Sequence, residues 1–189
     1  MLVLLTLLAG CGYTFQGAGS VLPPDVKTIY IPQIENNTTE SSLTNLLTEA
    51  LRDQFDRYGA VSVVEDLNSA DAVLKTKILG LKRAATTTNA TTDTTLQQNT
   101  VMVVSAELRR VTGPLLWTNP KLSVSQSYGT TAGSVNTSSA AFAGGSVSAA
   151  DVGSLSGREL SRGQEQEALN SMAEQVAKKV YEDAVMPDF

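Results

Sequence analysis

The residues that could carry chemistry in this chain are few. The 189 residues include one cysteine, Cys11, and no histidine. The absence of histidine excludes Ser-His-Asp and Cys-His nucleophile pairs, and it excludes every histidine metal site. With one cysteine, the chain can form neither an internal disulfide nor a CxxC metal or redox motif. Three states remain for the thiol of Cys11: buried in a core, reactive, or covalently modified.

The residues before Cys11 favour the modified thiol. Residues 2–10 are apolar except for Thr6, and this run is far shorter than the roughly 20 apolar residues that span a bilayer. A short apolar run that ends in small residues is typical of a secretory signal peptide. The stretch Leu8-Ala9-Gly10-Cys11 resembles the bacterial lipobox, in which the cysteine becomes the lipid-bearing N-terminus. We therefore predict that residues 1–10 are removed and that acyl chains on Cys11 anchor the protein.

Two neighbouring features refine this prediction. The run has no Lys or Arg of the kind that begins a signal peptide, so we expect residues before Met1 in the translated protein. Gly12, rather than aspartate, follows the cysteine, which in the enteric sorting rule implies transport to the outer membrane. We expect a lipid-anchored protein on the periplasmic side of that membrane.

A second candidate for chemistry is a group of acids early in the chain, and two carboxylates could in principle hydrolyse glycosides. The group comprises Glu35, Glu40, Asp53 and Asp56. Asp53 and Asp56 lie three residues apart with Arg52 and Arg57 adjacent, a spacing typical of ion pairs on a solvated helix face. We therefore interpret these acids as surface residues and predict no enzyme and no cofactor.

Length and composition limit the number of domains and the class of partner that the chain can have. The length and the 42% hydrophobic content suit one domain with a sizeable core. The net charge of −5 offers no basic excess for binding a nucleic acid backbone. Nucleic acid is therefore excluded as the expected partner.

Hydrophobic periodicity predicts two helices. Asn37 and Glu40 have the spacing of a capping box, which predicts a helix start, and Gly59 is expected to end that helix. The apolar positions of the first helix are Leu43, Leu46, Leu47, Ala50, Leu51 and Phe55. Those of the second are Leu169, Met172, Ala173, Val176, Ala177 and Val180, with Pro187 after it.

The remaining periodic segments predict strands. VKTIYIPQI and AVSVVED are rich in β-branched residues, and ADAVLKTKILGLKR and TVMVVSAELRRV alternate between apolar and polar positions. Thr112-Gly113-Pro114 predicts a turn into LLWTNPKLSVSQSY, where Pro120 predicts a bulge or break. Residues 84–100 and 129–157 are polar, nearly uncharged and low in complexity, and we expect them to be loops, either functional or disordered.

Taken together, several stretches resemble one known family. CGYTFQG, LPPDVKTIYIPQIENNTTE, the leucine-rich helix, ADAVLKTKI, the GPLLW hairpin and the closing helix are similar to the LptE family of lipopolysaccharide-assembly lipoproteins. The resemblance covers essentially the whole chain after the cysteine. It implies an α+β fold: a two-layer sandwich of two amphipathic helices on a mostly antiparallel sheet of four to five strands. A lipidated tether over residues 11–26 would lead into a single domain over residues 27–189.

The resemblance also implies partners. Members of the family plug an LptD-type outer-membrane β-barrel, assist its assembly and help deliver lipopolysaccharide to the cell surface. Basic residues on loops are thought to touch lipopolysaccharide, but here the two polar segments contain no Lys or Arg. The nearest cations flank them, and we take as candidate lipopolysaccharide contacts Lys82, Arg83, Lys121, Arg158 and Arg162. Reversing the charge of Lys82 and Arg83 together is expected to weaken lipopolysaccharide binding.

Two other lipoprotein classes stay open. IPQIENNTTE before a helix is also found, more loosely, in curli-type secretion-pore subunits and in activators of peptidoglycan synthases. A pore subunit needs strands of alternating polarity long enough to cross a bilayer, about 9 to 11 residues each. A synthase activator often has a long Pro-rich tether, whereas residues 12–26 form a short one.

Overall fold

The computed structural model describes residues 21–89, 94–129 and 149–186. Cys11, the signal peptide, the tether up to residue 20 and Pro187 lie outside these residues, so the predictions made for them stay predictions. The elements in chain order are β1 (Thr28–Tyr30), β2 (Glu35–Asn36), α1 (Ser42–Tyr58), β3 (Ser62–Val64), a short 3-10 turn (Leu67–Ser69), β4 (Ala72–Asn89), β5 (Thr94–Arg110), β6 (Leu115–Gly129) and α2 (Ala149–Val185).

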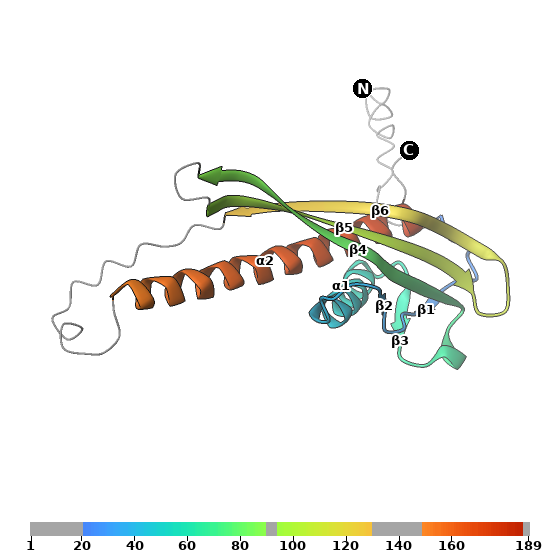
Figure 1. Ribbon diagram of the computed structural model, residues 1–189. Coiled ribbons are helices and arrows are strands. Elements are labelled where there is room, and N and C mark those ends of the chain that lie inside the picture. The colour runs from blue at the N-terminus through green and yellow to red at the C-terminus, as the bar shows by residue number, and fades with distance from the viewer. Residues whose placement is uncertain (1–20, 90–93, 130–148, 187–189) are drawn as a thin grey trace, which may run out of the picture.

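The strands form one mixed sheet. Its order is β3-β1-β4-β5-β6, with β2 also paired to β4, which makes six strands. The short strands pair in parallel, whereas β4, β5 and β6 form a long antiparallel meander. Both helices lie against the same side of this meander (Figure 1). The α+β architecture with two helices on one sheet is therefore confirmed, although the sheet has more strands than expected and its short strands are parallel.

The core lies between the helices and the sheet. The predicted apolar faces are confirmed. In α1 the fully buried residues are Leu43, Leu47, Leu51 and Phe55. In α2 every predicted apolar residue is at most 3% exposed. Leu46 and Ala50 are partly buried at the edge of this core. Gly59 has a φ of 62° and ends α1, because a left-handed residue closes a helix and glycine adopts it without strain.

The predicted capping box of Asn37 and Glu40 was wrong. α1 begins at Ser42, and Ser41 at its N-cap makes no side-chain cap hydrogen bond. Asn36 shapes the approach to the helix instead: its Oδ1 accepts from Thr38 N at 2.9 Å, and its Nδ2 donates to Glu40 O at 2.8 Å. The carboxylate of Glu40 is unavailable as a cap because it pairs with Arg83.

The two expected polar loops also differ from the structure. Most of the loop expected over 84–100 is strand, because β4 continues to Asn89 and β5 begins at Thr94. The polar composition suggested a loop, but threonine is β-branched and suits a strand that is solvated on both sides. α2 begins at Ala149, so 149–157 are helical. A helix already held by its packed half extends easily, because each added residue gains a hydrogen bond without a new nucleation cost.

Two bulges decide which side chains face the helices. In β4 the pairing with β5 shifts between Ile78 and Gly80, and in β6 the partners of Val104 and Ala106 are Leu122 and Asn119. An extra residue reverses the alternation of side chains beyond it. In β6 the extra residue falls at Pro120, as the sequence predicts. In β4 the shift turns Leu81 and Arg83 toward the helices, and it leaves Leu79 43% exposed on the other face.

Candidate functional site

The helix-facing side of the meander changes chemistry along its length. The row of Ile78, Val104 and Leu122 and the row of Leu81, Met102 and Val124 are apolar. The next row across the three strands comprises Arg83, Thr100 and Gln126, and the row after it comprises Ala85, Gln98 and Tyr128. The outer part of this face is therefore polar, although it lies on the same side of the sheet as the core.

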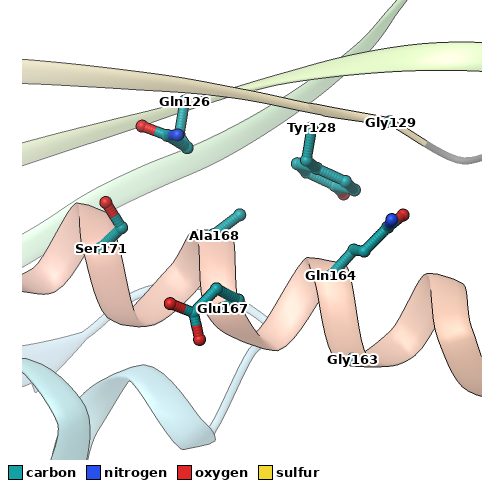
Figure 2. A pocket seen from close by; sticks show the side chains of 8 residues that line it. All are labelled: Gln126, Tyr128, Gly129, Gly163, Gln164, Glu167, Ala168 and Ser171. Atoms are coloured by element: carbon teal, nitrogen blue, oxygen red, sulfur yellow. The ribbon is translucent and has the colours of Figure 1, made fainter.

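α2 changes in the same way where it passes beneath these rows. Its C-terminal half buries Met172 and Val176 completely, whereas Gln164, Glu165 and Glu167 precede them. Strand and helix thus flank an open cleft of about 550 Å³ that is lined by several polar side chains and that we call the distal cleft (Figure 2). It is lined by Gln126, Tyr128, Gly129, Gly163, Gln164, Glu167, Ala168 and Ser171.

Arg83 ties three elements together close to this cleft. Its Nη2 lies 3.2 Å from Oε2 of Glu40 and 2.8 Å from Oε1 of Glu165. These side chains are 30%, 33% and 36% exposed, so solvent only partly screens the network. Two carboxylates neutralise the guanidinium, which joins β4, the segment before α1, and α2.

A chain of hydrogen bonds orders the other polar groups of the distal cleft. Nε2 of Gln175 donates to Oε1 of Gln126 at 3.1 Å and to Oγ of Ser171 at 3.2 Å. Because these bonds occupy acceptor atoms, the amide hydrogens of Gln126 and the hydroxyl hydrogen of Ser171 remain available to donate. Oε1 of Gln164 is buried and has no hydrogen-bond partner among the described residues. The cleft therefore holds both unused donors and an unused acceptor.

The opposite side of the meander, which neither described helix covers, has a different charge pattern (Figure 1). We call it the open face. A shallow hollow of about 410 Å³ lies on it, lined by Lys75, Lys77, Ser105, Glu107 and Pro120 among others. Two of the described ion pairs lie on this face. Nζ of Lys77 is 3.0 Å from Oε2 of Glu35, and Nη2 of Arg109 is 3.9 Å from Oε2 of Glu107. Within the described ranges no ion pair is found for three exposed lysines, Lys75, Lys82 and Lys121.

The five candidate lipopolysaccharide contacts are not brought together. Lys82 lies on the open face, and Lys121 is exposed at the bulge of β6. Arg83 points the other way, toward the helices. Arg158 and Arg162 belong to α2 rather than to the end of a loop.

The helical acids make none of the expected ion pairs in the part of the chain that the structure describes. Arg52 turns away from Asp53 and Asp56, because its Nε and Nη2 donate to the carbonyl oxygen of Ile31 at 3.2 and 2.9 Å. Asp53 and Arg57 line a groove between the two helices. The described residues contain no group of three metal-ligating side chains. Among the described helices, none combines the length and the apolar character needed to cross a bilayer.

Sequence reasoning missed the distal cleft. Gln126, Tyr128, Gln164 and Ser171 form no motif, and they come from two elements separated by the polar segment 130–148. The alternation of Val124, Gln126 and Tyr128 with exposed serines was the one available signal, because it placed polar residues on the inner face of the strand.

Comparisons with known proteins give one family. The LptE family model, described as lipopolysaccharide assembly, matches residues 26–184. No curated protein sequence matches the chain. Among solved structures, rare lipoprotein B from Shewanella oneidensis is similar at 15% identity and a TM-score of 0.44, covering 82% of this chain and 92% of that one. A minor lipoprotein from Acinetobacter baumannii is similar at 12% identity and a TM-score of 0.45, covering 86% of this chain and 96% of that one.

Proposed function

Because the chain belongs to the LptE family of lipopolysaccharide-assembly proteins, whose model matches residues 26–184, we propose that it is a lipoprotein of the outer membrane. In this proposal acyl chains on Cys11 anchor it on the periplasmic side, and its domain plugs the lumen of an LptD-type β-barrel. It assists assembly of that barrel and takes part in delivering lipopolysaccharide to the cell surface. The role is structural and needs no catalysis. The family match carries the proposal.

The surface of the meander suits such a plug. The lumen of a large β-barrel is polar and wet. Ser123, Ser125 and Ser127 are exposed on one face of β6, and β4 and β5 continue as a Thr-rich hairpin beyond the core. With 18 residues, β4 extends about 60 Å at about 3.3 Å per residue, roughly twice the hydrocarbon thickness of a bilayer. Beyond Leu81 the strand is polar, and this outer part can lie along the wall of a barrel lumen.

The position of the N-terminal segment is compatible with a lipid anchor. Val21 N donates to the carbonyl oxygen of Val185 at 3.0 Å, so the chain enters the domain beside the C-terminal end of α2. The C-terminal end of β4, the N-terminal end of β5 and the N-terminal half of α2 lie at the other end (Figure 1). A short tether therefore holds the domain by the end opposite to its polar end, which leaves the polar end free to enter a barrel lumen.

Lipopolysaccharide contact is assigned first to Lys82 and Lys121. Both are exposed without an ion pair among the described residues, so each can approach an anionic phosphate without first breaking a protein contact. Arg158 and Arg162 of α2 remain candidates at the polar end of the domain. In this proposal Arg83 does not contact lipopolysaccharide directly, because Glu40 and Glu165 already bind its guanidinium.

The test is affinity purification of the C-terminally tagged protein from detergent-solubilised outer membranes of its own host. We expect one large β-barrel protein at an equimolar ratio, identified by mass spectrometry, and an intact mass that shows acylation at Cys11. A Cys11→Ser variant is the control for lipid attachment. Recovery of a peptidoglycan synthase, or of this chain alone, would contradict the plug and favour one of the other lipoprotein classes.

A further inference from the structure

The distal cleft has a ligand chemistry of its own. Gln126, Gln164 and Ser171 provide amide and hydroxyl groups, and Tyr128 provides an aromatic ring. Tyr128 and Gln126 extend from β6 toward α2, while Gln164 extends from α2 toward the strand (Figure 2). Polar side chains thus converge on the cleft from both walls.

The hydrogen-bonding capacity of the cleft is mixed. The Gln175 amide fixes Gln126 and Ser171 as donors, through bonds of 3.1 and 3.2 Å to their oxygens. Oε1 of Gln164 is a buried acceptor for which the described part of the chain offers no partner. Leaving a buried polar atom unpaired costs about 1 to 3 kcal/mol, so such an atom indicates either a ligand or stored strain. A ligand with several groups that both donate and accept, such as the hydroxyls of a sugar, could satisfy these side chains at separate positions.

Charge excludes anionic ligands from the cleft. Glu167 is the one charged residue among the described residues that line it, and it is negative. The nearest described cation of the sheet, Arg83, is neutralised by Glu40 and Glu165. Among the described residues that line the cleft, a phosphate or carboxylate would therefore meet no cation and one repelling carboxylate. Neutral hydroxyls carry no such penalty.

From these observations we infer that the distal cleft binds an uncharged sugar unit of an oligosaccharide. The Tyr128 ring packs against the apolar face of the pyranose ring. Gln126 Nε2 and Ser171 Oγ donate to its oxygens, and Gln164 Oε1 accepts from one of its hydroxyls. A volume near 550 Å³ lies within the usual range for small-molecule sites. The inference rests on the cleft alone and does not depend on the proposed function.

Ligand-observed saturation-transfer NMR on the full chain in detergent tests this inference. The probes are a dephosphorylated core oligosaccharide released from lipopolysaccharide, and a chitotetraose that represents the glycan of peptidoglycan. We expect saturable transfer to at least one probe. Gln164→Leu and Tyr128→Ala should each weaken that binding by about tenfold, the size expected for losing one buried hydrogen bond or one ring contact. Binding of one probe only identifies the source of the sugar.

A matched control lies two residues away on the same helix. Gln166 is exposed, and its Nε2 bonds to Asn170 Oδ1 at 3.4 Å outside the cleft, so Gln166→Leu should leave sugar binding unchanged. Gln164→Leu removes an unpaired buried acceptor and is not expected to lower stability, which separates lost binding from lost folding. Absence of transfer from both probes, or equal effects of Gln164→Leu and Gln166→Leu, would overturn the inference. Neither NMR result predicts the outcome of the affinity purification, so this inference and the proposed function can fail independently.

Discussion

At the scale of single residues, Asp71 shows how one carboxylate can join distant parts of the chain. Its Oδ2 accepts from Lys27 N, Thr28 N and Thr28 Oγ1, each at 2.9 Å, and so fixes the start of β1 to the start of β4. The backbone amide of Lys27, then the amide and hydroxyl of Thr28, hold the pKa of this carboxyl below its usual value of 3.8. The ionised form is therefore preferred in the folded state.

A pH dependence follows from this lowered pKa. Stability from Asp71 is fully present above the unfolded-state pKa near 3.8 and is lost as the pH falls through the lower folded-state value. Asp71→Asn should lower the urea midpoint at pH 7, and its difference from the wild type should shrink below pH 4, as followed by circular dichroism. Asp53→Asn, on the exposed face of α1, is the control. A constant difference across the pH range would contradict the assignment.

At the scale of the elements, two buried threonines differ in how their hydroxyls are satisfied. Thr48 of α1 donates to Thr44 O at 2.6 Å and accepts from Ile34 N at 3.3 Å, which joins the helix to the strand segment before it. Thr100 of β5 is 1% exposed, and its Oγ1 finds no hydrogen-bond partner within the described ranges. It marks the boundary where the inner face of the sheet passes from apolar to polar rows.

Replacing each threonine with valine should therefore have opposite effects. Thr100→Val removes an unpaired buried hydroxyl and should stabilise the fold by about 0.5 to 1.5 kcal/mol. Thr48→Val leaves the amide of Ile34 unpaired and should destabilise it by about 1 to 3 kcal/mol. Thermal unfolding of the two variants measures both signs. A loss of stability in Thr100→Val would show that its hydroxyl has a partner in solution.

At the scale of the whole molecule, charge is distributed unevenly. The chain has a net charge of −5, yet its open face carries exposed lysines that make no ion pair within the described ranges. The distal cleft on the other side contains one carboxylate and no cation among its described residues. Anionic groups are therefore favoured on one side of the sheet and neutral polar groups on the other.

This asymmetry predicts where lipopolysaccharide binding is sensitive to charge. Lys82→Glu combined with Lys121→Glu should weaken binding of the purified protein to lipopolysaccharide by about tenfold, and added salt should reduce the difference. Lys178→Glu, on the helix side, is the control for a charge reversal away from the open face, and it is compared with each single variant, Lys82→Glu and Lys121→Glu. Arg83→Glu should instead lower thermal stability, because it places a third carboxylate beside Glu40 and Glu165. Unchanged binding in the double variant would exclude Lys82 and Lys121 as contacts.

The sequence by itself determined the layers of this fold. The spacing of apolar residues along the chain decides which face of each helix is buried and how the side chains of β4 and β5 alternate. Gly59 ended its helix, and Pro120 marked a bulge, because their backbone preferences act locally. The tertiary structure alone decided that Arg83 faces the helices while Lys82 faces solvent. A shift of pairing near Gly80 reverses side-chain direction. A glycine inside a strand can mark a bulge, but only the pairing with β5 decides which residue is extra. The distal cleft likewise exists only where α2 and β6, far apart in the chain, enclose their polar ends.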